Sequence, residues 1–444
     1  MREKMRQSDL FRMSWPVLAE LIFIGIIGNF NQLIINAFSP DAVAATGSAS
    51  LVFQLVVNVY GIISIGGSIL LAPVIGAKKK EDGIQMALTI LIDTMLMGFV
   101  LGLGCLLALP LILRMLHIPA ELTSMTKEYL AIVLGLSVFQ GMLSSLTAVY
   151  RSMGRMKLVM VNDALVNLSC VILNGCVLSF IPVHRQSISF YALNGILAQG
   201  LGVLVLLAAM KKDGFFSLKL NFKKVREILR RQSGRILHFG ILGGLEGIVY
   251  LIGQTVVMGF VGMLGTQAMT ARAYAANLTA YMAVFTSALS TACAPLVGMY
   301  LGEGRIRDVE RICRKVIRLG IALTAVVSAV LMAVSGPVLR IYTKDAVMLE
   351  EAYKVLIVNI ILELLRAIAG PAVAALKAVG DVVYPFKMVI VGMALNIGLS
   401  YICGVVLGWG LTGIWTGYIT DMLFRSVMCW MRFKKGKWHN IRMF

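Results

Sequence analysis

Long apolar segments recur along the whole chain, and each is about as long as a helix that crosses a lipid bilayer. A hydrocarbon core about 30 Å thick requires about 20 helical residues, at a rise of about 1.5 Å each. Of the 444 residues, 59% are hydrophobic and only 14% are charged, which gives more apolar surface than a water-soluble chain of this length buries. We therefore predict an all-α polytopic membrane protein with twelve transmembrane helices. The twelve segments lie at residues 14–38, 48–76, 87–110, 127–150, 158–181, 190–210, 236–262, 273–301, 317–335, 352–376, 384–408 and 410–431.

The basic residues are distributed unevenly around these segments. The chain has 41 Lys and Arg against 22 Asp and Glu, a net charge of +19. Most of the basic residues fall at the two ends and in alternate loops, which twelve spans place on the same side of the membrane. By the positive-inside rule that side is the cytoplasm. We predict a multi-pass protein of the cell (cytoplasmic) membrane with both termini in the cytoplasm, and no nucleic-acid partner.

Residue patterns typical of enzymes or metal sites do not occur in the sequence. The seven cysteines lie in or beside apolar segments without CxxC spacing, and the four histidines lie singly with no HExxH motif. We therefore predict no catalytic residues, no metal site and no enzymatic activity.

The second half of the chain repeats the first. The stretch "AVYRSMGRMKLV" at 148–159 returns as "ALKAVGDVVYPF" at 375–386. Six helices per copy is an even number, so both copies enter the membrane from the same side. The repeat predicts two six-helix bundles related by pseudo-two-fold symmetry along the membrane normal. The aligned pairs, each 226 residues apart, are Arg151 with Lys377, Gly154 with Gly380 and Glu20 with Glu246.

This duplication predicts a division of the chain into lobes. Between the copies lies a basic segment whose apolar residues recur at helical spacing, as in an amphipathic helix on a membrane surface; a loosely ordered basic linker is the alternative. The predicted parts are an N-terminal six-helix lobe at 1–210, a cytoplasmic amphipathic linker at 211–235, a C-terminal six-helix lobe at 236–432 and a basic cytoplasmic tail at 433–444.

Several motifs, in order along both halves, resemble the multidrug and toxic compound extrusion (MATE) family of twelve-helix transporters. The resemblance implies a secondary antiporter that exports amphiphilic, often cationic, compounds by alternating access of two lobes. It also implies H+ or Na+ as the coupling ion, no other cofactor, and a monomer whose partners are a small amphiphilic substrate and the lipid bilayer. The motifs are "WPVLAEL", "PDAVAATG", "LLAPVIGAKKKEDG", "IPAELTSMTKEYL", "YRSMGRMK", "KAVGDVVYPF" and "GWGLTGIWTGY".

One apolar segment carries a glutamate and an arginine near its middle. Asn359, Glu363 and Arg366 are spaced i, i+4 and i+7 and share one helical face. Ionisable groups at this depth are costly and mark either a buried pair or a transport pathway. Two interpretations remain open: a structural ion pair, or a carboxylate that exchanges H+ or Na+ for substrate while Arg366 stabilises its charged form.

The resemblance also exposes a departure from the family. One branch carries a titratable Asp in the first helix, fifteen residues after a proline, and here that position, counted from Pro16, is Asn31. The same branch has an Asn and an Asp in helix 5, where this chain has Cys170 and Asn174. Because neither asparagine can titrate, proton coupling of that kind is not expected in the first lobe.

The other branch places acids in helices 7 and 10, within about a turn of Glu246 and Glu363. We therefore predict coupling through the second lobe. Glu20 and Glu246 occupy matching places in the repeat. Two interpretations are therefore open for both: a shared architectural role, such as a hydrogen bond to a neighbouring helix, or cation coupling. Asp421 and Arg425, one turn apart, are expected to form a buried or interfacial pair.

These considerations give two sets of candidate residues and one alternative function. The alternative is a flippase for a lipid-linked saccharide, which requires a more cationic cavity than Arg272 and Arg366 provide. The cation-coupling candidates are Glu363, Glu246 and Glu20, and the cavity or substrate candidates are Asn31, Gln32, Asn174, Gln254, Asn359, Arg366 and Asn396.

Overall fold

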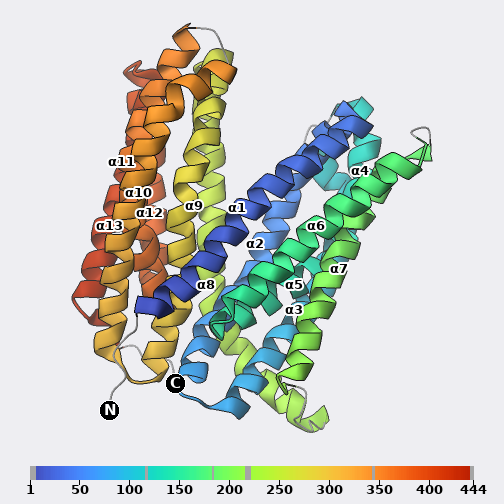
Figure 1. Ribbon diagram of the computed structural model, residues 1–444, viewed down its shortest axis with the longest axis vertical. Helices are drawn as coiled ribbons and strands as arrows, with labels where there is room; N and C mark the ends of the chain where they lie inside the picture. The colour runs from blue at the N-terminus through green and yellow to red at the C-terminus, as the bar shows by residue number, and fades with distance from the viewer. Residues whose placement is uncertain (1–6, 116–118, 183–184, 216–221, 343–345, 441–444) are drawn as a thin grey trace. The chain divides into compact units, whose positions relative to one another are not determined.

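The computed structural model describes residues 7–115, 119–182, 185–215, 222–342 and 346–440, and their regular structure is helical. The predicted all-α architecture is therefore confirmed in the described residues (Figure 1). The helices are α1 (Gln7–Phe38), α2 (Pro40–Gly76), α3 (Lys80–Met115), α4 (Ala120–Gly135), α5 (Val138–Ser152), α6 (Met156–Phe180), α7 (Ile188–Lys212), α8 (Phe222–Met263), α9 (Thr266–Gly302), α10 (Ile306–Tyr342), α11 (Ala346–Ala378), α12 (Val383–Leu399), the π-helix η2 (Ser400–Val406), α13 (Gly410–Lys434) and the 3-10 helix η3 (Lys437–Asn440).

The helices have the length that a bilayer requires. Ten of the described helices are long and apolar enough to cross a membrane, and α4 with α5, bent by 48° at their break, would make an eleventh. The twelfth predicted segment coincides with α13, which has the length of a span at 25 residues but carries Asp421 and Arg425 in its interior. Each predicted segment thus corresponds to one of these helices or to the bent pair.

The span predicted at 127–150 is two helices because its backbone breaks between Gly135 and Val138. No proline causes the break. The Ser137 hydroxyl at the break is hydrogen-bonded to the hydroxyl of Tyr60 in α2 at 3.0 Å, and both side chains are fully buried. The apolar pattern runs through this point without interruption, so hydropathy predicts the span but not its bend.

Contacts divide the chain into two compact units. The N-terminal unit contains residues 19–244, and the C-terminal unit contains residues 1–18 and 245–444. Two helices therefore pass from one unit into the other: α1 between Leu18 and Ala19, and α8 between Gly244 and Leu245.

The lobe boundaries derived from the repeat stay a prediction. Part of the predicted linker at 211–235, residues 216–221, lies outside the described residues, as do residues 441–444 of the predicted tail. From Phe222 onward the chain forms one continuous helix to Met263.

The sequence repeat appears in the structure as a repeated helix end. Gly154 and Gly380, just beyond α5 and α11, have φ angles of 75° and 85°, in the left-handed region that side chains disfavour. After each glycine the next amide donates to the carbonyl five residues earlier, which is the Schellman cap. The cap places Arg151 and Lys377, three residues before the glycines, in corresponding positions of their units.

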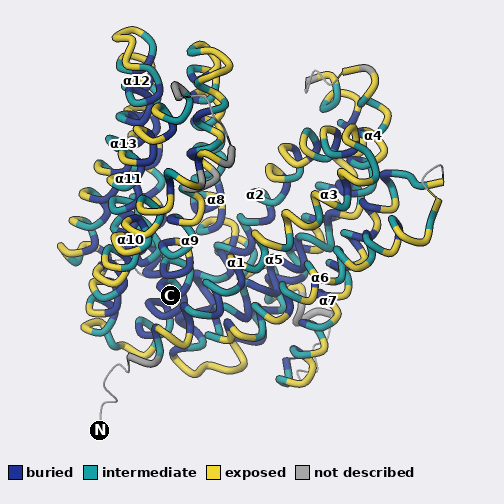
Figure 2. Tube along the Cα trace, turned by 45° about the horizontal axis from the view of Figure 1, so that its top comes forward, coloured by how far each residue is buried: buried dark blue, intermediate teal, exposed yellow. Residues whose placement is uncertain are grey.

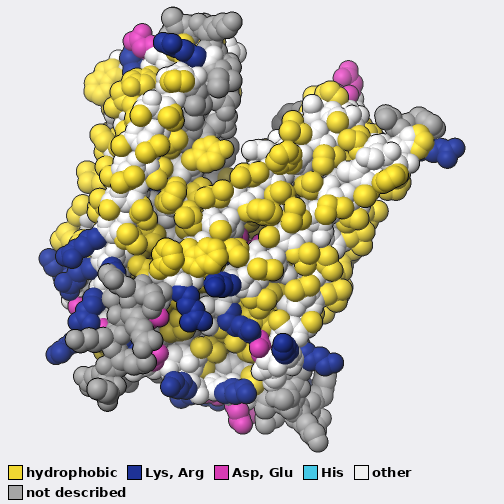
Figure 3. All heavy atoms as spheres, in the orientation of Figure 1, with side chains coloured by type: hydrophobic (Ala, Val, Ile, Leu, Met, Phe, Trp, Pro, Cys, Tyr) yellow, Lys and Arg dark blue, Asp and Glu magenta, His cyan; other side chains and the backbone are white. Residues whose placement is uncertain are grey.

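The surface of both units is apolar along the helices. Leu107 and Phe180, for example, are 76% and 83% exposed. Buried and exposed positions alternate along the helices (Figure 2), and hydrophobic side chains cover most of the face shown in Figure 3, while Lys and Arg gather at the helix ends. So much exposed apolar area is stable only in contact with lipid.

Candidate functional site

Glu363 and Arg366 touch. The Arg366 Nη1 donates to Glu363 Oε1 at 2.6 Å, both side chains coming from one face of α11 as their spacing predicts. Glu363 is only 1% exposed, whereas 28% of the Arg366 side chain is accessible. The second carboxylate oxygen, Oε2, is buried and receives no hydrogen bond from the described residues. Glu363 is thus a buried charge with one strong partner and one unused acceptor.

A second ion pair lies on α13, which packs against α11. Arg425 Nη2 donates to Asp421 Oδ2 at 2.5 Å, and Asp421 is fully buried, so the predicted buried pair is confirmed. The two pairs thus lie on two helices that pack together. Within each pair the charges cancel, which is the condition under which buried ions are tolerated.

Asn359 and Gln254 are connected through two aromatic residues. The Trp415 Nε1 donates to Asn359 Oδ1 at 3.4 Å, and the Tyr418 hydroxyl donates to Gln254 Oε1 at 2.9 Å. The two rings meet edge to face, 5.6 Å apart. Sequence reasoning missed Trp415 and Tyr418 as site residues, although both stand in the "GWGLTGIWTGY" motif and amphipathic aromatics commonly line binding sites.

In the N-terminal unit, amides form a ladder between three helices. Asn194 of α7 donates to Asn174 Oδ1 at 2.9 Å, and Asn174 of α6 donates to Asn31 Oδ1 at 2.7 Å. The structure therefore brings the two predicted residues of α1 and α6 together, and adds Asn194, which sequence reasoning missed. Every group in the ladder is neutral, so it binds helices together without a titratable group.

Glu20 and Glu246 each pair with a basic residue of their own unit. Arg151 Nη2 lies 2.5 Å from Glu20 Oε1 and 3.9 Å from Asp163 Oδ2, and the Glu20 side chain is 3% exposed. In the C-terminal unit, Lys377 binds Glu246 Oε2. These contacts connect α1 to α5 and α8 to α11 and agree with a shared architectural role.

Two predicted cavity residues lie apart from these groups. Gln32 is exposed, and Asn396 of α12 is fully buried. The Ser400 hydroxyl donates to Asn396 Oδ1 at 3.0 Å, while Asn396 Nδ2 has no acceptor among the described residues. The π-helix η2 begins at Ser400, so this amide sits where the backbone of α12 widens. Among the described residues there is no group of three or more His, Cys, Asp or Glu able to hold a metal ion.

Comparison with known proteins gives one consistent result. A family model described as MatE matches residues 16–181 and 244–402. "Uncharacterized transporter YisQ" of Bacillus subtilis (strain 168) is 24% identical over 97% of this chain and 94% of its own length. "Probable multidrug resistance protein NorM" of Thermotoga maritima is 21% identical over 97% of this chain and 93% of its own length.

Solved structures agree at the level of the fold. An outward-facing multidrug resistance MATE family transporter of the MOP superfamily superposes with a TM-score of 0.86 at 19% identity, covering 99% of this chain and all of its own. A MOP superfamily transporter from Pyrococcus furiosus, described as having a binding pocket of reverse polarity, gives 0.85 at 18% identity and covers the same shares. These likenesses confirm the predicted polytopic fold.

Proposed function

The chain belongs to the MatE family of multi-pass membrane transporters, and from this premise we propose that it is a secondary antiporter that exports amphiphilic, cationic compounds in exchange for H+ or Na+. It works in the cytoplasmic membrane with both termini in the cytoplasm, by alternating access of two lobes. The substrate chemistry and the coupling ion are part of the proposal.

The observation that carries the coupling proposal is the state of Glu363. Its carboxylate is 1% exposed, bound by Arg366 through one oxygen, and has a second oxygen without a donor among the described residues. A proton or Na+ could occupy that free acceptor without displacing Arg366. In the N-terminal unit the amide ladder around Asn174 offers no charge to neutralise, and the buried or partly buried acids of that unit that lie together, Glu20 and Asp163, share one arginine, Arg151.

The exchange then follows from competition for one carboxylate. A proton or Na+ at Glu363 cancels its charge and weakens its attraction for a cationic substrate, which leaves. Loss of the ion restores the charge, and the next cationic substrate binds. Asn359, Gln254 and the aromatic pair Trp415 and Tyr418 supply hydrogen bonds and apolar area for orientation, so that discrimination rests on shape more than on a tight polar pocket.

Efflux from proteoliposomes tests this function. A fluorescent lipophilic cation is loaded, and an H+ gradient and a Na+ gradient are imposed separately on wild type, Glu363→Gln and Asp381→Asn. Asp381 is the matched control because it is also buried and paired with an arginine, Arg432, at 2.8 Å, but it lies in the turn between α11 and α12. We expect one gradient to drive efflux in wild type and in the control, and Glu363→Gln to abolish it.

Other outcomes would change the assignment. Efflux by Glu363→Gln at the wild-type rate would make this glutamate a structural partner of Arg366, and Glu246→Gln would then be tested in the same way. No efflux under either gradient would favour the flippase. In a flippase, a pyrophosphate would need cationic partners. The C-terminal unit offers Arg425, which is buried, and Arg366 and Arg272, which are partly buried.

A further inference from the structure

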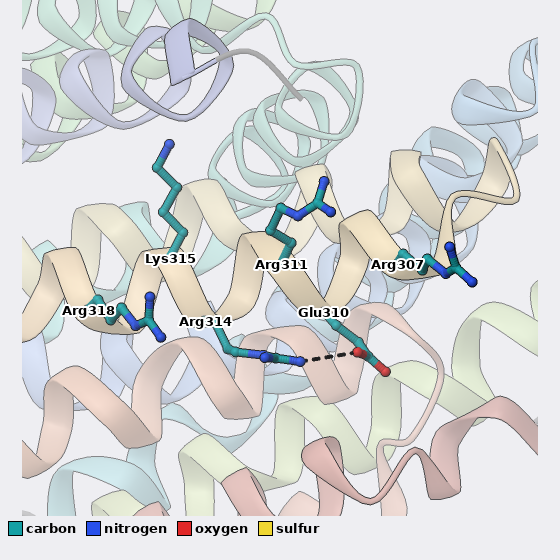
Figure 4. A pocket seen from close by; sticks show the side chains of 6 residues that line it. All are labelled: Arg307, Glu310, Arg311, Arg314, Lys315 and Arg318. Carbon is teal, nitrogen blue, oxygen red and sulfur yellow. Dashed lines mark hydrogen bonds and ion pairs between the residues drawn. The ribbon is translucent and has the colours of Figure 1, made fainter. Parts of the chain in front are cut away.

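The first three turns of α10 carry a row of basic side chains that the proposed transport cycle does not use. Their spacing of i, i+4, i+7, i+8 and i+11 puts them on one face of the helix. With Glu310 they line a hollow of about 600 Å³ (Figure 4). The opposite face of α10 is buried in the C-terminal unit. We call the row the cationic stripe; its members are Arg307, Arg311, Arg314, Lys315 and Arg318.

The stripe is only partly neutralised by acids. Arg311 binds Asp308 at 2.9 Å and Arg314 binds Glu310 at 3.4 Å, but these arginines are 61% and 53% exposed, and such surface pairs are weak. The other members, Arg307, Lys315 and Arg318, have no acidic partner among the described residues. The hollow therefore keeps a surplus of positive charge and of N–H donors, which suits phosphate oxygens.

The depth of the stripe follows from the sequence of α10. Between Arg318 and Arg340 there are 21 consecutive uncharged residues. As a helix they span about 32 Å, which matches a hydrocarbon core about 30 Å thick. Arg318 is thereby placed at the edge of the hydrocarbon, and Lys315 and Arg314 stand about 5 Å further out, in the headgroup layer. Arg311 and Arg307 continue toward water.

We propose that the cationic stripe binds the headgroups of anionic phospholipids, with the phosphate held by Arg318, Lys315 and Arg314. Charge complementarity and continuity with the membrane-crossing part of the same helix favour a lipid, because a phosphate at this depth already lies in the bilayer surface. The site does not depend on the transport proposal. In the proposed orientation it faces the cytoplasmic leaflet, which carries the anionic lipids.

Electron spin resonance of spin-labelled phospholipids tests the site. Wild type and variants are placed in phosphatidylcholine nanodiscs with a trace of labelled phosphatidylglycerol or labelled phosphatidylcholine, and the immobilised fraction of each label is measured. We expect wild type to immobilise phosphatidylglycerol preferentially. The double variant Lys315→Gln and Arg318→Gln should bind phosphatidylglycerol less selectively. Each cation removed should lower the preference by a factor of about two to five. The exchange Lys315→Arg with Arg318→Lys should retain it.

A matched control separates a site from a general effect of charge. The double variant Lys79→Gln and Lys80→Gln removes the same charge from two exposed positions, just before α3 and at its first residue, and should leave the preference unchanged. Equal losses in both double variants, or a loss in neither, would overturn the proposal. Binding of inorganic phosphate is measured by calorimetry in phosphatidylcholine nanodiscs. If phosphate binds and needs Lys315 and Arg318, while the spin labels show no preference for phosphatidylglycerol, the ligand is a soluble anion and the proposal is overturned.

Discussion

Glu246 of α8 and Lys377 of α11 form an ion pair inside the C-terminal unit. The pair repeats, 226 residues later, the contact of Glu20 with Arg151 in the N-terminal unit. In both units the basic residue stands three residues before a left-handed glycine that closes its helix. The duplication has thus preserved a carboxylate, its partner and the cap that positions the partner. This favours an architectural role for the two glutamates, while their part in coupling stays a prediction.

Removing Lys377 should destabilise the C-terminal unit. Lys377→Ala leaves Glu246 as an unpaired charge that is 15% exposed, and we expect a loss of about 3 kcal/mol in the free energy of unfolding. Lys377→Arg should lose much less, because it keeps the charge. Thermal unfolding in detergent measures the difference. Lys387→Ala, an exposed lysine of α12, is the control, and a loss there as large as in Lys377→Ala would contradict the role of the pair.

The Glu363–Arg366 pair predicts non-additive effects on stability. Arg366→Gln leaves a buried carboxylate with no cation bound to it, so it should destabilise by about 3 kcal/mol. Adding Glu363→Gln to Arg366→Gln removes the buried charge and should recover most of that loss, although transport is then abolished. Denaturation of the two single variants and the double variant completes the cycle. Additive losses would show that the residues are energetically independent.

The amide ladder should matter for stability but not for the choice of ion. Asn174→Ala deprives Asn31 of its donor and Asn194 of its acceptor, and we expect a loss of about 1 to 3 kcal/mol. Because no member of the ladder titrates, the ratio of H+-driven to Na+-driven efflux should equal that of wild type. A changed ratio would place coupling in the N-terminal unit.

Packing of α13 on α12 requires a glycine at position 417. A Cβ there would lie 2.2 Å from Ser400 Oγ and 2.5 Å from the Asn396 carbonyl oxygen. Gly417→Ala should therefore destabilise by about 1 to 3 kcal/mol or more, since the backbone of α13 has to move. Gly398→Ala, in α12 with nothing within 4 Å of its Cβ, should be neutral or stabilising through helix propensity. Similar unfolding temperatures for both variants would refute the close contact.

The sequence allowed prediction of features that depend on spacing along one helix. The helical period does not depend on how the helices pack. It places Asn359, Glu363 and Arg366 on one face, and it brings Asp421 and Arg425 together. The repeat could be recognised for the same reason, because it compares the chain with itself.

Other features depend on contacts between distant segments and could not be predicted in this way. The break at Ser137 accompanies a hydrogen bond to Tyr60, seventy-seven residues earlier. The link from Asn359 to Gln254 runs through two aromatic rings on a third helix. No local pattern encodes these partners, and the apolar pattern around Ser137 reads as one straight span.

The repeated ion pairs also fix two helices within their units. Helix α1 leaves the C-terminal unit after Leu18, and Glu20 stands two residues further on. Helix α8 leaves the N-terminal unit after Gly244, and Glu246 stands two residues further on. Each pair therefore holds its helix within the unit that the helix has just entered. Just before its pair, α8 also lies close to α2, because a Cβ at Gly243 or Gly244 would lie 2.8 Å from Ile65 Cγ2 or 2.6 Å from Ile62 Cγ1. In each repeat the ion pair is thus a non-covalent cross-link between two helices of the same unit.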